Sequence, residues 1–160
     1  FATRSFVDSL PFSAAAATTI ASADTPVKAA GATSAMGATR DFDAGAATDN
    51  RLLYQGATKR LVKIDVAATL AAASGTNQEL ELSIYHHDAS AGSGSVLTGT
   101  KVSGHAAGTT GINVATSGVV ELETGDWLEV HVANVGATAN VTVQHGVVSA
   151  IGVEPEPEAA

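Results

Sequence analysis

The sequence predicts an all-β fold in one domain, and three observations support this. Apolar and polar residues alternate along several runs, which is the period of a strand with one buried face. Gly, Asn, Asp and Thr interrupt these runs at regular spacing, giving about eight strands, as in a sandwich, a barrel or a jelly roll. A length of 160 residues fits one domain with a sizeable core.

Four long runs carry the strongest alternation and are expected to form the main strands. They are RLVKIDVAATL (60–70), QELELSIYHH (78–87), DWLEVHVAN (126–134) and NVTVQHGVVSAI (140–151). In the last run, strict alternation places the residues Val141, Val143, His145, Val147 and Ile151 on the same face. Weaker strands are expected in TPVKAAG, RLLYQG, VLTGTKV and GINVATSGVVEL. The Ala-rich stretch 13–17 is too short for a helix that is stable alone.

The composition excludes several classes of protein. The net charge is −8 with only eight Lys and Arg, so a nucleic-acid or anionic-membrane partner is not expected. The chain has no Cys, which excludes disulfides and thiolate metal sites. We find neither a transmembrane run of about 20 apolar residues nor a signal-peptide pattern.

The stretch ELETGDWLEVHVANV (121–135) gathers carboxylates around Trp127 and could be read as an acid–base site. Gly125 supplies the positive φ of a tight turn, and Asp126 favours turn positions. The sequence therefore predicts a hairpin turn that leads into a half-buried strand, with Glu129 and His131 on its outward face.

Other polar groups also favour a structural reading. His86 and His87, which precede Asp88, point to opposite faces of a strand and cannot easily share a metal ion. Asp41 and Asp43 share a face but have no further oxygen ligands nearby. A glycosidase pair drawn from the glutamates would need an aromatic-lined cleft, which this chain can hardly build; the glutamates are Glu79, Glu81, Glu121, Glu123 and Glu129. We expect no enzyme activity, no catalytic residue, no metal and no cofactor.

The two ends differ from the middle of the chain. Residues 1–18 are expected to form an N-terminal arm that carries the bulky apolar residues Phe1, Phe6, Leu10 and Phe12. Exposing these residues to water is unfavourable, so they either fold back onto the sandwich or dock on a neighbour. Residues 19–152 form the domain, and the acidic, Pro-containing residues 153–160 form a tail.

Four motifs in order resemble a jelly-roll module of tailed-phage particles. They are T-P-V-K-x-A-G-x-T at 25–33, R-L-x-Y-x-G at 51–56, S-x-x-N-Q-E-L-x-x-x-I-Y at 74–85, and L-x-x-G-D-x-L-E-V-x-V-x-N at 122–134. The last motif also looks like the corresponding strand of the C1q and tumour-necrosis-factor (TNF) fold. The resemblance covers residues 19–152.

This resemblance implies an antiparallel jelly-roll sandwich of eight to ten strands with an extended arm. It further implies a homotrimeric capsid decoration (cement) protein on the outer surface of the virion, which clamps neighbouring major capsid subunits. Phe1, Phe6, Leu10 and Phe12 would then be the capsid-binding residues. The alternative is a trimeric receptor-binding or adhesive knob of a head or tail fibre, in which loops such as HHDASAGSGS would carry recognition.

Overall fold

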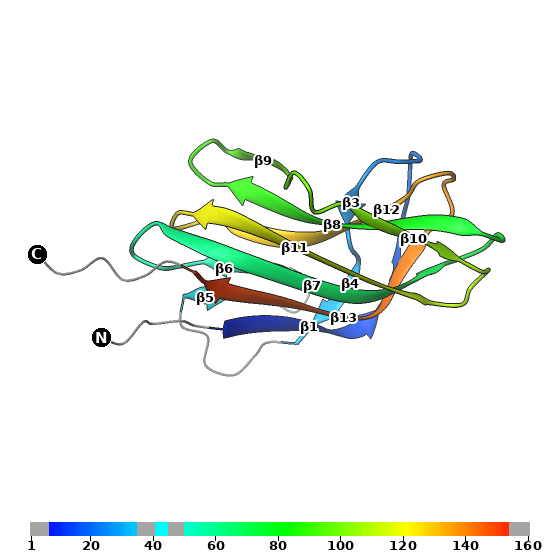
Figure 1. Cartoon of the computed structure of the whole chain (residues 1–160), viewed down its shortest axis with the longest axis horizontal. Coiled ribbons are helices and arrows are strands. Elements are labelled where there is room, and N and C mark those ends of the chain that lie inside the picture. The colour runs from blue at the N-terminus through cyan, green and yellow to red at the C-terminus, as the bar shows by residue number, and fades with distance from the viewer. Residues whose placement is uncertain (1–6, 35–40, 45–49, 154–160) are drawn as a thin grey trace, which may run out of the picture.

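The computed structural model describes residues 7–34, 41–44 and 50–153, and within them every regular element of secondary structure is a β-strand. Two antiparallel sheets pack face to face as a sandwich (Figure 1). This confirms the predicted fold class. The described residues contain no helix, and therefore none with the length and apolar character needed to cross a membrane.

The first sheet, called here the β7 sheet, has the strand order β11-β7-β13-β1-β4, and β2 also pairs with β13. Its strands are β11 (Ile112–Leu122), β7 (Arg60–Ala72), β13 (Val141–Gly152), β1 (Val7–Ala15), β4 (Gly31–Thr33) and β2 (Ala17–Thr18). In Figure 1 the red β13 lies between the turquoise β7 and the blue β1.

The second sheet, called here the β12 sheet, has the order β10-β8-β12-β6-β5, with β3 paired to β12 and β9 paired to β8. Its strands are β10 (Val102–Ala106), β8 (Gln78–Asp88), β12 (Trp127–Asn134), β6 (Arg51–Tyr54), β5 (Phe42–Asp43), β3 (Val27–Lys28) and β9 (Ser93–Val96). The four long predicted runs thus become β7, β8, β12 and β13.

The core lies between the two sheets and consists mainly of Val, Leu and Ile. The apolar residues that alternate along β7 are all buried, namely Val62, Ile64, Val66, Ala68 and Leu70. Their counterparts on β8 and β12 are buried as well, namely Leu80, Leu82, Ile84, Leu128, Val130 and Val132. Burying each large apolar side chain contributes about 1.5–3 kcal/mol, so this layer supplies most of the driving force for folding.

The prediction for β13 is wrong beyond its first three residues. Val141 and Val143 are buried as expected, but a register shift follows, between Val143 and His145. Such a bulge adds one residue to a strand and exchanges the two faces beyond it. Val148 and Ala150 therefore fill the core. The other predicted residues pair with the outward-facing residues of β7, as His145↔Thr69, Val147↔Ala67 and Ile151↔Lys63.

The segment assigned to the N-terminal arm belongs in large part to the sandwich. Residues 7–15 form β1, which pairs with β13 on one side and β4 on the other. Leu10 is only 2% exposed and lies in the core, and Phe12 packs against the core. Both side chains thus follow the fold-back alternative, because the sandwich offers an apolar surface within the same chain. Phe1, Phe6 and residues 154–160 lie outside the described residues.

Candidate functional site

The turn at 123–126 connects the two sheets instead of closing a hairpin. β11, which ends at Leu122, belongs to the β7 sheet, and β12, which starts at Trp127, belongs to the β12 sheet. The hairpin prediction is therefore wrong, although the turn itself is present. The Asp126 N–H donates to the Glu123 carbonyl over 3.0 Å, and Gly125 has a φ of +98°, which an L side chain rarely adopts.

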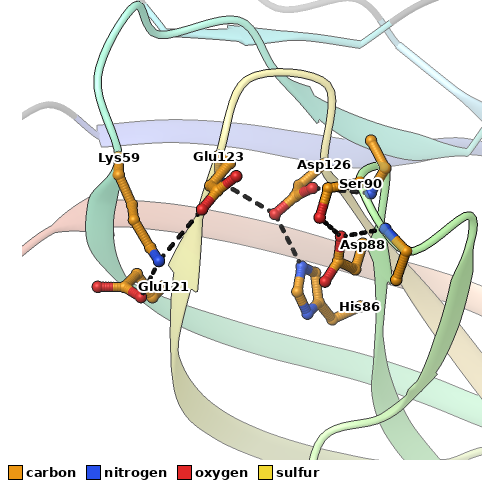
Figure 2. Close-up of polar contacts among 9 residues, drawn as sticks. Lys59, His86, Asp88, Ser90, Glu121, Glu123 and Asp126 are labelled. Carbon is orange, nitrogen blue, oxygen red and sulfur yellow. Dashed lines mark hydrogen bonds and ion pairs between the residues drawn. The ribbon is translucent and has the colours of Figure 1, made fainter.

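Asp126 holds this turn and the neighbouring loop together (Figure 2). Its carboxylate accepts the backbone N–H groups of Ala89 at 2.9 Å and Glu123 at 3.0 Å. His86 Nε2 lies 3.1 Å from the same group, and the Asp126 side chain is only 5% exposed. These contacts bind the start of β12 to the β8–β9 loop, so the carboxylate serves as a structural clamp.

The polar groups beside this clamp also form hydrogen bonds with one another. Ser90 Oγ donates to Asp88 Oδ1 over 2.7 Å, and this bond, with the Ala91 N–H, lowers the pKa of Asp88. Figure 2 shows this bond, so the hydroxyl hydrogen is used by Asp88 and is not shared with the His86–Asp126 pair. A nucleophile needs a hydrogen bond to its base, so these residues do not form a catalytic triad.

Lys59 pairs with two glutamates at the edge of the same region (Figure 2). Its Nζ lies 2.6 Å from Glu121 and 3.1 Å from Glu123, with all three side chains about half exposed. The hydrogen bonds to Glu121 and then to Glu123 raise the pKa of Lys59. Such exposed pairs contribute little to stability, and here the single charge of Lys59 offsets one of the two glutamate charges.

Glu129 lies at the centre of the outer face of the β12 sheet. Its Oε1 accepts from Lys28 Nζ at 2.8 Å and from Trp127 Nε1 at 3.1 Å. His131 Nε2 lies 3.2 Å from Oε2. Burial raises the pKa of Glu129, but the hydrogen bonds from His131 and Lys28 lower it by more, so it lies below its ordinary value. A carboxylate held ionised in this way is unsuited to donate a proton to a glycosidic oxygen.

The aromatic side chains of this face stack on one another. His87 stacks on Trp127 with ring centroids 3.5 Å apart, and the guanidinium carbon of Arg51 lies 5.2 Å from the Trp127 centroid. Tyr85 stacks on His131 at 4.4 Å. Stacking partners from the neighbouring strands thus occupy the indole, so it does not offer an open platform for a sugar.

The predicted metal candidates remain apart in the structure. His86 contacts Asp126, whereas its neighbour His87 contacts Trp127, as expected for adjacent strand residues. Asp43 Oδ2 accepts a hydrogen bond from Gln55 at 3.2 Å. Within residues 7–34, 41–44 and 50–153, no three or more His, Asp or Glu side chains are arranged to hold a metal ion.

The feature that sequence reasoning missed is an open groove on the outer face of the β7 sheet. Two shallow depressions of about 390 and 320 Å³ share Ala67, Ala115 and Val147 as lining residues. The β-sheet register explains this groove, because it aligns three rows across β11, β7 and β13: Asn113–Thr69–His145, Ala115–Ala67–Val147 and Ser117–Asp65–Ser149. The signal in the sequence was Gly146, which marks the bulge that turns His145 and Val147 outward.

Two antiparallel sheets in this strand order give the chain the fold of a jelly-roll sandwich of the TNF-like type. The crystal structures of murine APRIL at pH 8.0 and pH 8.5 both match with a TM-score of 0.60, at 10% and 11% identity. Each match covers 92% of this chain and 100% of the APRIL chain. At such low identity the likeness shows the fold alone. No protein-family model and no curated protein matches the sequence.

These comparisons agree with the C1q- and TNF-like part of the resemblance seen in the sequence. Nothing in them links the chain to a phage capsid. Binding to a capsid, assembly into a trimer and location on the virion surface therefore stay predictions.

Proposed function

We propose that this chain is a non-enzymatic structural module that assembles into a homotrimer and decorates the outer surface of a phage capsid. The observation that carries the assembly step is the groove on the outer face of the β7 sheet. The capsid step rests on the ordered motifs at 25–33, 51–56, 74–85 and 122–134.

The outer face of the β7 sheet has the composition of a contact surface. A solvated sheet face is normally polar, but here Val119 is 57% and Val147 is 36% exposed. Ala67 and Ala115 are exposed beside Val147, and such small side chains allow another flat surface to approach closely. Covering this apolar area would remove it from water, with a gain of about 25 cal/mol per Å².

Charge favours a second copy of the chain as the occupant of this face. Two chains of net charge −8 repel each other, so they can meet stably only where the local charge is low. On this face Lys63 Nζ and Asp65 Oδ1 lie 3.0 Å apart and neutralise each other. The groove row Ala115–Ala67–Val147 carries no charge. Self-association therefore meets little electrostatic resistance here.

Leu10 and Phe12 cannot serve as free capsid contacts, because both pack in or against the core. The proposal keeps Phe1 and Phe6 of the predicted arm for contact with the major capsid protein. The jelly roll would then supply the trimer, and the residues before β1 would supply the attachment.

Ala115→Arg tests the assembly step. Ala115 is exposed, so the fold should tolerate the substitution. We expect self-association to weaken by at least about a hundredfold, because an unpaired charge in an apolar contact costs several kcal/mol. Sedimentation velocity measures the change, and Ala91→Arg in the exposed β8–β9 loop is the matched control. Equal association of both variants would contradict the proposed face.

The capsid step is tested by the copy number of the chain on purified particles. A copy number comparable with that of the major shell protein is expected of a decoration protein. A much lower copy number, as expected at vertices or on fibres, would contradict the decoration function and favour the receptor-binding or adhesive knob. Absence from particles would overturn the capsid assignment altogether.

A further inference from the structure

We propose that protonation of His145 controls the self-association of this chain, so that assembly weakens between neutral and mildly acidic pH. The inference rests on the proposed self-association and concerns the same face. It deepens that function by giving the contact surface a regulator.

His145 lies at one end of the groove, in the row Asn113–Thr69–His145. The bulge after Val143 turns its side chain outward, where it is exposed. The close packing of Gly146 helps to fix this geometry, since a Cβ there would lie 3.3 Å from both the Ala67 carbonyl and the Phe12 ring. The imidazole is thus held at the rim of the proposed contact.

The described residues give this imidazole no hydrogen-bond partner and no carboxylate. Thr69 Oγ1 donates to Asn113 Oδ1 over 2.7 Å, so its row neighbours bond to each other. On β7, Asp65 is four residues from Thr69, or about 13 Å along the strand, and pairs with Lys63. On β11, Glu121 pairs with Lys59, and on β1 the backbone of Asp8 is in register with Ala150.

A proton on His145 would therefore bring an uncompensated charge into the assembled face. Burying such a charge is unfavourable, and symmetric copies would add like charges to the same contact. Histidine is the side chain whose ordinary titration lies between about pH 5 and 8. Because the assembly favours the neutral imidazole, assembly releases protons, and its stability is lost as the pH falls.

The test compares the wild-type chain, His145→Gln and His145→Lys at about pH 7.5 and about pH 5.5 by sedimentation velocity. The wild-type association should weaken by about tenfold or more at the lower pH. His145→Gln should associate equally at both values, and His145→Lys should associate weakly at both. His105→Gln, on an exposed position of β10 in the other sheet, is the matched control and should behave as wild type.

The outcomes separate this inference from the function on which it rests. Wild-type chains that stay monomeric at both pH values overturn both proposals. Equal association at both pH values overturns the role of His145 and leaves self-association standing. A pH dependence of association that persists in His145→Gln also overturns the role of His145. Trp127, the single Trp of the chain, reports by its fluorescence that each variant is folded.

Discussion

At the scale of single residues, Glu129 connects three side chains on the outer face of the β12 sheet. Lys28, Trp127 and His131 all approach its two oxygens within 3.2 Å. Their hydrogen bonds favour the ionised form more strongly than burial disfavours it. The carboxylate is therefore a source of stability that depends on pH.

Glu129→Gln should remove part of the loss of stability in acid. The pKa of Glu129 is lowered from 4.5 in the folded chain. Ionised Glu129 thus stabilises the fold above the unfolded pKa, and this contribution is lost as the pH falls through the folded pKa. Urea unfolding from neutral pH to about pH 3 measures it, followed by Trp127 fluorescence. Glu121→Gln, at a half-exposed position, is the control; an unchanged acid slope in Glu129→Gln would contradict the assignment.

Asp126→Ala should destabilise the chain by about 3 kcal/mol, because hydrogen bonds to a buried carboxylate are worth more than neutral ones. It leaves the N–H groups of Ala89 and Glu123 without their acceptor. Denaturant unfolding measures the loss, and Asp88→Ala at the end of β8, where the hydrogen bonds of the carboxylate are exposed, should cost much less. A loss below about 1 kcal/mol would show that water replaces the clamp.

The sequence correctly predicts the turn and the positive φ of Gly125 within it, because the residues that form a turn are adjacent in the chain. The clamp made by Asp126 was not predictable, since Ala89 and His86 reach it from a strand and loop 37 or more residues away. The same limit explains the hairpin error. Alternation shows which face of a strand is buried, but it does not show which strand lies beside it.

At the scale of elements, β1 and β13 show how a strand pattern can mislead. β1 contains Pro11 and an Ala-rich end, so its composition hid a strand that pairs with both β13 and β4. In β13, one extra residue reverses the faces and places Val147 and His145 on the outer face. The groove therefore depends on a bulge that strict alternation cannot reveal.

Leu10→Ala should destabilise the chain by about 2–5 kcal/mol, which is the range for a large apolar side chain removed from a core. Leu10 is 2% exposed and belongs to the central cluster. Denaturant unfolding measures the change, with Val153→Ala as the control because Val153 is 41% exposed. If Leu10→Ala is as stable as the control, β1 does not pack in the sandwich and residues 7–15 belong to a free arm.

At the scale of the whole molecule, the fold class follows from alternation, turn residues and length, all of which the sequence displays. The open face of the β7 sheet cannot be predicted from these features, because it arises from the register of β11, β7 and β13 together. Ala67 and Ala115 are individually unremarkable residues, and only the sheet sets them beside Val147. Both the proposed assembly and its control by His145 depend on that register.

The mass of the chain in solution tests self-association most directly. Light scattering or native mass spectrometry at about pH 7.5, over a range of concentrations, gives it without any label. If the chain forms a trimer, the measured mass should be three times the 15.9 kDa of one chain. In Ala115→Arg the mass should fall toward that of one chain. A wild-type mass of 15.9 kDa at every concentration would contradict it.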